Sequence, residues 1–432
     1  MISILVFHWN RFLGELNYSK CDYRKAIEYF EKALKSVNNE PKNANIIHNL
    51  GWSYLLIENY DKAMEYFEKA SKVDNDYLRK FYNIGFVECY MENYSKAIEY
   101  FEKLLKLNPR YDNVWNYLGY SYTQLEKYDK AIECYGRVPK TDENYFNATY
   151  NIGLRYYVLD EYDKAIEYLD KALEIDPNDE DTLNYLGRAY NSKGDYNKAK
   201  EYFKKSLELN PKNSDALSGL GSVYSNTMEY DKAIEYCKKA LKLNPKDSFA
   251  IYCIGSAYEY KEDYAAAKKY YDEAISMDPD YACPKCGIGD IYKKRDKNYE
   301  FALKLYKEAI EEYPGCAHLN FRIGDMLLKT KDADADNNEN FKEYFEKSHK
   351  LLKEDLLRME HPRYRANWYE MLGIISMQLN NKDEAKEYFE KALDYAKECN
   401  IVYSTRLYKD VTREEFIKEC KTYIDKLSNL SN

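Results

Sequence analysis

Apolar residues recur along this chain at intervals of three and four positions, in short segments separated by turns. In EYDKAIEYLDKAL (161–173), Ala165 and Leu169 fall on the face that packs, whereas Asp163 and Lys164 face water. Closely similar segments occupy residues 59–71, 93–105 and 229–241. Spacing of this kind predicts a long series of amphipathic helices.

Glycine sets the period of the series. Eight glycines follow one another at a constant interval of 34 residues: Gly51, Gly85, Gly119, Gly153, Gly187, Gly221, Gly255 and Gly289. Gly14, Gly324 and Gly373 extend the series with irregular spacing. Because a glycine inside a helix costs about 0.5–1 kcal/mol relative to alanine, its repeated use predicts a second helix that crosses too closely for a side chain.

A second helix follows each glycine. A small residue recurs twelve positions after it, as at Ala165, and a larger apolar residue follows four positions later, as at Leu169. Proline then closes several units, because the residue before a proline is pushed out of the helical region. These prolines are Pro109, Pro177, Pro211, Pro245, Pro279 and Pro314. Each unit is therefore predicted to be a helix, a tight turn, an antiparallel helix and a second turn.

This spacing resembles the tetratricopeptide repeat (TPR) family. In one unit, the family's register is occupied by Trp115, Leu118, Gly119, Tyr122, Ala131, Tyr135 and Asp142-Glu143. The resemblance covers roughly residues 7–399. It implies an all-α fold, a right-handed α-solenoid (superhelix) of about eleven helix-turn-helix units, with a concave groove lined by the first helix of each pair.

The domain organisation follows from the same register. We expect the repeat array to occupy residues 1–399, with units beginning near residues 7, 44, 78, 112, 146, 180, 214, 248, 282, 317 and 366. Residues 329–340 (KTKDADADNNEN) form an acidic insertion in unit ten. Residues 400–432 are expected to be a linker and a C-terminal capping helix, which Thr412 and Glu415 open with the pattern of a capping box.

The TPR register also implies which side chains point into the groove. The candidate partner-binding residues are His48, Asn49, Trp52, Tyr82, Asn83, Phe86, Asn116, Tyr120, Tyr150, Asn151, Leu154, Asn184 and Arg188. Aromatic residues dominate the earlier units. The later units are polar, with Asn191, Ser218 and Ser222 near Asp181 and Asp215, and then Asp290 and Asp325. We interpret the aromatic residues as anchors for a partner; the alternative is that they pack on neighbouring helices.

The acidic insertion has the spacing of a calcium-binding loop. Asp332, Asp334, Asp336 and Glu343 occupy positions at which alternate carboxylates converge on one cation. Asn337 stands where such loops normally have glycine, and Glu339 stands where they have an apolar residue. A solvated acidic insertion is the alternative interpretation, and the high rate of false motif matches favours it.

A second metal hypothesis concerns CPKCG at 283–287, which resembles half of a zinc knuckle. Zinc requires four ligands, usually a second cysteine pair. No second pair follows, although the register brings Cys283, Cys286 and His318 to groove-facing positions on neighbouring helices. Because Gly289 keeps the repeat phase, an ordinary repeat helix already explains the segment, and the high rate of false motif matches favours that interpretation.

Composition excludes several classes of function. The 65 basic and 74 acidic side chains give a net charge of −9, and no Lys/Arg run is present, which is atypical of a nucleic-acid-binding protein. No apolar run approaches the roughly 20 residues that a membrane span requires. The ten scattered cysteines suit a reducing compartment, and the N-terminal segment is a poor signal peptide. We therefore expect a cytoplasmic protein with no nucleic-acid or membrane partner.

The sequence contains no constellation typical of an enzyme. None of the five histidines lies in an HExxH motif, and there is neither a P-loop nor a G-x-S-x-G elbow. Carboxylates are interleaved with lysines along the outer helix faces, which is typical of a solvated surface. We therefore expect a protein without catalytic residues or cofactor.

The most consistent interpretation is a scaffold that binds an extended peptide or a helix of a protein partner in its concave groove. An alternative comes from the apolar N-terminus, which contains Ile2, Ile4, Leu5, Val6, Phe7 and Trp9. We expect these side chains to pack on the next helix. If they are exposed instead, they form a self-association patch for a homo-oligomer, and the chain is a self-assembling structural element.

Overall fold

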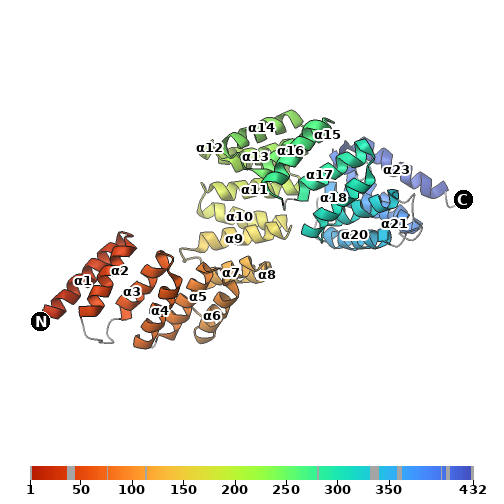
Figure 1. Cartoon of the computed structure of the whole chain (residues 1–432). Coiled ribbons are helices and arrows are strands. Elements are labelled where there is room, and N and C mark those ends of the chain that lie inside the picture. The colour runs from red at the N-terminus through yellow and green to blue at the C-terminus, as the bar shows by residue number, and fades with distance from the viewer. Residues whose placement is uncertain are drawn as a thin grey trace. The chain divides into compact units, whose positions relative to one another are not determined.

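The computed structural model describes residues 2–36, 44–74, 76–111, 114–279, 282–330, 340–357, 362–399, 401–404 and 409–429. Within these ranges it contains 23 α-helices and one two-stranded antiparallel sheet. The helices follow one another as eleven consecutive pairs and one final helix (Figure 1). The expected all-α repeat fold is thereby confirmed. None of the helices in the described ranges has both the length and the hydropathy needed to cross a lipid bilayer.

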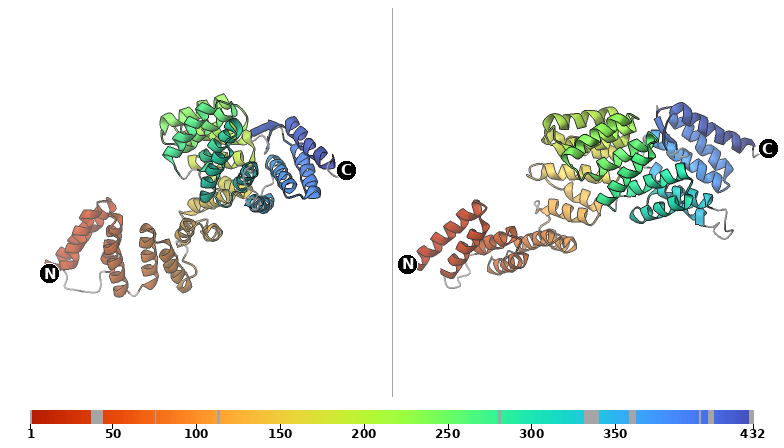
Figure 2. Two further views of the ribbon diagram at one scale, coloured as in Figure 1. Left: turned by 45° about the vertical axis from the view of Figure 1, so that its right-hand side comes forward. Right: turned by 45° about the horizontal axis from the view of Figure 1, so that its top comes forward.

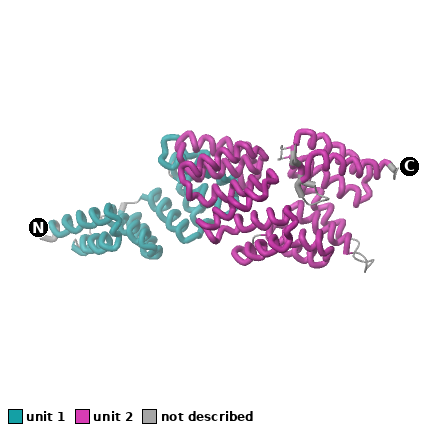
Figure 3. The backbone as a smooth tube through the Cα atoms, turned by 90° about the horizontal axis from the view of Figure 1, so that it is seen from above, with its two compact units in different colours: residues 1–155 teal, residues 156–432 magenta. Residues whose placement is uncertain are grey.

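The chain divides into two compact units, residues 1–155 and residues 156–432 (Figure 3). The boundary falls inside helix α9 (Tyr145–Val158). The first unit contains α1 (Ile2–Ser19), α2 (Tyr23–Ser36), α3 (Ala44–Leu56), α4 (Tyr60–Asp74), α5 (Tyr77–Tyr90), α6 (Tyr94–Leu107), α7 (Trp115–Gln124) and α8 (Tyr128–Tyr135). The repeat pattern does not distinguish these two units, because it continues through the boundary unchanged.

The second unit contains the later helix pairs, which are seen from two further directions in Figure 2. They are α10 (Tyr162–Ile175), α11 (Glu180–Lys193), α12 (Tyr196–Leu209), α13 (Ser214–Asn226), α14 (Tyr230–Leu243), α15 (Ser248–Tyr260), α16 (Tyr264–Met277), α17 (Ala282–Ile291), α18 (Tyr299–Glu312), α19 (Ala317–Lys329), α20 (Asn340–Leu356), α21 (Pro362–Gln378) and α22 (Lys382–Ala396). A π-helical turn, η2 (Tyr292–Asp296), extends α17.

Ten of the eleven repeat glycines have a side chain of the second helix so close that a Cβ atom would clash with it, as the sequence predicts. A Cβ atom built on Gly187 in α11 would lie 2.8 Å from Cε1 of Phe203 in α12, which is closer than real Cβ atoms approach. Gly219 in α13 contacts the same ring, with its Cβ position 2.4 Å from Cε1. The buried ring of Phe203 is therefore held between glycines of two consecutive first helices.

In most pairs the turn between the two helices is closed by a left-handed residue other than glycine, whereas Gly194 closes the turn after α11. After α3, Glu58 adopts a left-handed conformation with φ 62°. Its N–H donates to the carbonyl of Leu55 at 2.9 Å, and the N–H of Asn59 donates to that of Tyr54 at 2.9 Å. These bonds satisfy the last carbonyls of the helix and reverse the chain within few residues. The second helix therefore lies antiparallel to the first.

The C-terminal part contains a feature that the sequence analysis did not predict. Strands β1 (Ile401–Ser404) and β2 (Lys409–Thr412) pair antiparallel, where a linker was expected. The capping helix α23 (Arg413–Asn429) follows directly, and its capping box is present, because Thr412 Oγ1 accepts from the Glu415 N–H at 3.3 Å. Val402 and Val411 are buried against Phe416, so the hairpin covers the end of the helical core.

The N-terminal helix exposes most of its apolar side chains, which corrects the expectation that they pack on the next helix. Leu5, Trp9 and Phe12 are 66%, 62% and 53% exposed. Phe7 alone among the N-terminal apolar residues whose side chains are described is buried, at 9% exposure. The cause is that α1 packs on α2 with the face that carries Phe7 and Gly14, and Leu5, Trp9 and Phe12 lie on another face.

Candidate functional surfaces

The first unit carries a row of aromatic rings on its first helices. Trp52 lies on α3, Tyr82 and Phe86 lie on α5, and Tyr117 lies on α7. The ring centroids of Trp52 and Phe86 are 5.2 Å apart, and those of Phe86 and Tyr117 are 4.6 Å apart. We call these four residues the aromatic row. Each ring is half-buried, so the row leaves only part of its area for a partner.

The aromatic row is anchored in the core of the first unit. Trp52 contacts the buried ring of Phe67 at 5.7 Å, and its Nε1–H donates to His48 Nε2 at 3.2 Å. Burial raises the pKa of Tyr82, which keeps its hydroxyl protonated at neutral pH. Tyr82 and Tyr117 also line a cavity of about 460 Å³ with Asp142 and Glu143. The rings thus pack on neighbouring helices and remain partly exposed.

Other candidate groove residues lie outside the aromatic row. Tyr120 is 43% exposed and contacts Tyr94, at 6.0 Å between ring centroids. Tyr150 stacks on Phe146 at 6.2 Å. The remaining candidates of the first unit are half-buried along the same helices: Asn49, Asn116, Asn151 and Leu154.

Two asparagines proposed for the groove are buried instead. Asn83 is 2% exposed and Asn184 is 3% exposed, so neither is available to a partner. Asn184 donates through Nδ2 to Asn213 Oδ1 at 3.3 Å and thereby links α11 to the N-cap of α13. The helical period turns these positions toward the adjacent helix rather than toward the groove.

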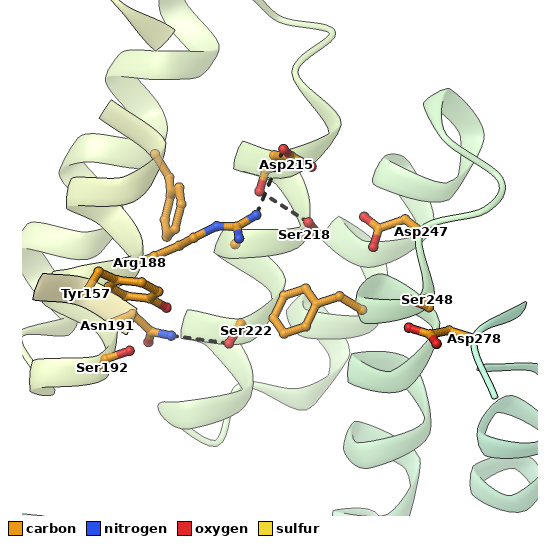
Figure 4. Close-up of a pocket in the computed structure, with 13 residues that line it drawn as sticks. Tyr157, Arg188, Asn191, Ser192, Asp215, Ser218, Ser222, Asp247, Ser248 and Asp278 are labelled. Carbon is orange, nitrogen blue, oxygen red and sulfur yellow. Dashed lines mark hydrogen bonds and ion pairs between the residues drawn. The ribbon is translucent and has the colours of Figure 1, made fainter. Parts of the chain in front are cut away.

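The second unit contains a polar cavity of about 450 Å³, shown in Figure 4. The candidate Arg188 lines it, together with Asn191, Ser218 and Ser222, which the sequence analysis placed among the polar residues of the later units. Asn191 Nδ2 donates to Ser222 Oγ at 3.3 Å, and Asn191 Oδ1 accepts from Asn226 Nδ2 at 3.0 Å. These amides and hydroxyls come from α11 and α13, and they offer both donors and acceptors.

The polar cavity has an acidic bias. Arg188 lies 3.9 Å from Asp215, and Asp247 and Asp278 line the wall opposite Tyr157 (Figure 4). One carboxylate oxygen of Asp247 accepts from the Ala250 N–H at 2.9 Å, and the other is buried without a hydrogen-bond partner. A buried acceptor of this kind favours a ligand that donates hydrogen bonds.

A larger cavity of about 670 Å³ lies among α15, α17, α19 and α21 of the same unit. Four carboxylates line it, those of Asp160, Glu259, Asp290 and Asp355, and we call it the acidic cavity. Arg322 carries the one permanently charged cationic side chain among its described lining residues. Ser192 lines this cavity and the polar cavity, so the two adjoin.

Buried ion pairs connect the helices around the acidic cavity. Arg322 Nη2 donates to Asp290 Oδ2 at 2.7 Å, and the Tyr306 hydroxyl donates to Asp290 Oδ1 at 2.6 Å. Glu259 accepts from Lys294 Nζ at 2.7 Å and from the Tyr271 hydroxyl at 2.8 Å. Burial raises the pKa of Glu259, and the Lys294 charge partly offsets this effect.

The zinc hypothesis finds no support in the geometry. Cys283, Cys286 and His318 all line the acidic cavity. Among the described residues, however, no three His, Cys, Asp or Glu side chains converge to hold a metal ion. Burial raises the pKa of the Cys286 thiol to about 12, which disfavours the thiolate that zinc requires. His318 Nε2 is instead 3.3 Å from Asn367 Oδ1.

The calcium hypothesis falls mostly outside the described residues. Asp332, Asp334 and Asp336 belong to the undescribed part of the insertion. Glu343, the remaining proposed ligand, lies exposed in the first turn of α20.

Sequence comparisons agree with the repeat architecture. Models of the tetratricopeptide repeat match residues 5–76, 144–212, 214–247, 248–281 and 366–399. A model described as anaphase-promoting complex, cyclosome, subunit 3 matches residues 90–172, and a Sel1 repeat model matches residues 287–313. A search of curated proteins finds no match.

Solved structures of similar fold include three repeat proteins. A monomeric mutant of IFIT1 with Gppp-AAAA is 17% identical with a TM-score of 0.48, over 82% of this chain and 91% of that chain. Yeast Tom70 is 17% identical with a TM-score of 0.42, over 98% of this chain and 96% of that chain. MamA is 30% identical with a TM-score of 0.31, over 38% of this chain and 95% of that chain.

Proposed function

Because the chain belongs to the tetratricopeptide repeat family, whose arrays are typically scaffolds for protein–protein interaction, we propose that it is a non-enzymatic scaffold that binds an extended peptide or a helix of a protein partner. The partner segment lies along the first helices of the repeats. The aromatic row holds apolar side chains, and the polar cavity holds backbone amides or polar side chains. A cytoplasmic location is part of this proposal, since the described ranges contain all ten cysteines and no disulfide.

The observation that carries the proposal is the position of Ser192 in the second unit. This residue lines both the polar cavity and the acidic cavity, so polar side chains of successive first helices surround adjoining spaces. An extended segment is a suitable occupant, because its backbone needs donors and acceptors at regular intervals. Asn191 and Ser222 present such groups on two consecutive repeats.

The polar cavity provides a direct test of peptide binding. Peptides selected on the full chain from a random library should bind the variant Arg188→Ala/Asn191→Ala about tenfold more weakly than the unmodified chain, which corresponds to about 1.4 kcal/mol. The reason is that the variant removes a cation and an amide from two turns of α11. Fluorescence polarisation with labelled peptides measures the dissociation constants.

A matched control uses an ion pair on an outer helix. Glu235 and Lys239 of α14 pair at 2.6 Å with side chains 58% and 47% exposed, away from both cavities. The variant Glu235→Ala/Lys239→Ala should bind the selected peptides as the unmodified chain does. Equal affinity of the Arg188→Ala/Asn191→Ala variant and this control would contradict the proposed site.

A second candidate function is self-assembly through α1. Leu5, Trp9, Phe12 and Leu16 are exposed at spacings of four, three and four residues, which places them in one stripe along the helix. This is the spacing of a coiled-coil seam. A second copy of the chain presents the same stripe, so two copies of α1 can bury it in a two-fold symmetric contact.

Self-assembly predicts a mass that depends on concentration. The full chain should approach twice its monomer mass as its concentration rises in light scattering coupled to size-exclusion chromatography. Trp9→Glu/Phe12→Glu should abolish the increase, because two charges in the stripe oppose burial. The control Arg11→Ala/Glu15→Ala removes an exposed ion pair from another face of α1 and should leave the increase unchanged. A monomer mass at every concentration would rule out this candidate.

A further inference from the structure

The acidic cavity is chemically different from the polar cavity. Four first helices, α15, α17, α19 and α21, contribute most of its lining, the turn before α10 contributes Asp160, and α20 contributes Asp355. A volume of about 670 Å³ lies within the range of ligand-binding pockets, about 300–1,000 Å³. This space is too large to be a packing defect, so its lining is informative about an occupant.

The lining is unbalanced in charge. The described lining residues include one permanently charged cation, Arg322, and four carboxylates, those of Asp160, Glu259, Asp290 and Asp355. Lys294 forms an ion pair with Glu259 but does not itself line the cavity. Among the described lining residues, the carboxylates therefore outnumber the cationic side chains. A lining with more carboxylates than cationic side chains attracts a cationic group and repels phosphates.

Aromatic rings form a second, independent feature of the lining. Tyr252, Tyr260, Tyr313, Tyr364 and Trp368 line the same cavity as the carboxylates. The faces of such rings attract an ammonium or a guanidinium group, and their edges pack against the aliphatic stem that carries it. A hydrated metal ion would not use these rings, whereas a lysine or arginine side chain uses both the rings and the carboxylates.

The cavity also offers hydrogen-bond acceptors. When His318 Nε2–H donates to Asn367 Oδ1, His318 Nδ1 remains an acceptor. Burial lowers the pKa of His318 to about 4, so the imidazole is neutral at pH 7 and does not compete with a cation. Glu259 accepts two hydrogen bonds, and a carboxylate has about four acceptor positions.

We propose that the acidic cavity binds a lysine or arginine side chain of the partner segment. This inference rests on the proposed peptide-binding function and specifies its chemistry. The adjoining polar cavity, reached past Ser192, receives the residues that flank the basic one. This continuity favours a basic side chain of a peptide over a free polyamine, which requires no flanking site.

Asp160→Asn is the most informative variant. Asp160 is exposed and lies in the left-handed region with φ 58°, a conformation that asparagine tolerates. The substitution removes one negative charge from the cavity. It keeps an oxygen that can accept a hydrogen bond from the Tyr162 hydroxyl, as the Asp160 carboxylate does at 2.5 Å. The control Asp231→Asn removes the same charge from a side chain that is 87% exposed and does not line the cavity.

The experiment is a double-mutant cycle on the full chain. Peptides selected from a random library are resynthesised with each lysine replaced by norleucine, which keeps the stem and removes the charge, and with each arginine replaced by leucine. We expect the replacement at one basic position of the peptide to weaken its binding to the unmodified chain about tenfold. The same replacement should weaken binding to the Asp160→Asn variant much less, because that variant already lacks the carboxylate charge that pairs with the basic residue. Asp231→Asn should behave as the unmodified chain.

The outcomes separate this inference from the proposed function. Selected peptides that lack basic residues, or that show no coupling to Asp160, overturn the inference and leave peptide binding intact. Failure to select any peptide overturns both. If spermidine binds more tightly than the peptides and its affinity depends on Asp160 in the same way, the occupant of the cavity is a free polyamine. That result overturns the assignment to a peptide side chain.

Discussion

Replacing Asp290 with alanine should lower the free energy of unfolding of the second unit by about 3–5 kcal/mol, because breaking a buried ion pair leaves its partner charge uncompensated. Asp290 is 5% exposed, and it accepts from Arg322 on one oxygen and from Tyr306 on the other. Burial raises the pKa of the Tyr306 hydroxyl, so the hydroxyl stays protonated and also loses its acceptor. The substitution thus removes links among α17, α18 and α19. Denaturant-induced unfolding followed by circular dichroism measures the change.

Two further variants isolate the cause of this effect. Asp290→Ala/Arg322→Met should recover part of the lost stability, because it removes the unpaired guanidinium. Glu235→Ala removes a carboxylate from an exposed pair on α14 and should change the free energy of unfolding by about 0.5 kcal/mol or less. A loss for Asp290→Ala no larger than that for Glu235→Ala would show that the buried pair does not stabilise the unit.

Replacing Gly219 with alanine should also destabilise the second unit, by about 1–3 kcal/mol, although alanine is the better helix former. The new Cβ would lie 2.4 Å from Cε1 and Cζ of Phe203. The ring cannot retreat, because Gly187 approaches it from another helix, with a Cβ position 2.8 Å from Cζ. The crossing of α11, α12 and α13 must therefore open. The same unfolding experiment measures the loss.

The control for Gly219 is a glycine with open space around it. Nothing lies within 4 Å of a Cβ built on Gly315, so Gly315→Ala should change stability by about 0.5 kcal/mol or less. Gly219→Ala/Phe203→Leu should be less destabilised than the sum of its single variants, because the smaller side chain accommodates the added methyl group. Strict additivity of the two substitutions would show that they do not meet in the core.

The candidate surfaces were predictable in part. The register placed Trp52, Phe86 and Arg188 on first helices, and the structure finds the first two half-buried in the aromatic row and the third in the polar cavity. The register did not predict that Asn83 and Asn184 are buried, because a shift of one position along a helix separates a groove-facing residue from a buried one. The register also placed Asp290 in the groove. Its partners Tyr306 and Arg322 were not predictable, because they lie on other helices and periodicity within one helix carries no information about pairs across helices.

The sequence by itself determined the repeat. Its period, its helix pairs, the close crossings at glycine and the charged outer faces follow from the spacing of residue types, because residues three or four positions apart lie on the same face of a helix. Helices α3, α11, α13, α15, α17 and α19 begin at the residues that the period predicts. Only the tertiary structure decided where the chain divides into compact units, which face of α1 stays exposed and how carboxylates from four elements come to surround one cavity. These features depend on small rotations and shifts between successive helix pairs, which a nearly constant repeat does not encode in any single unit.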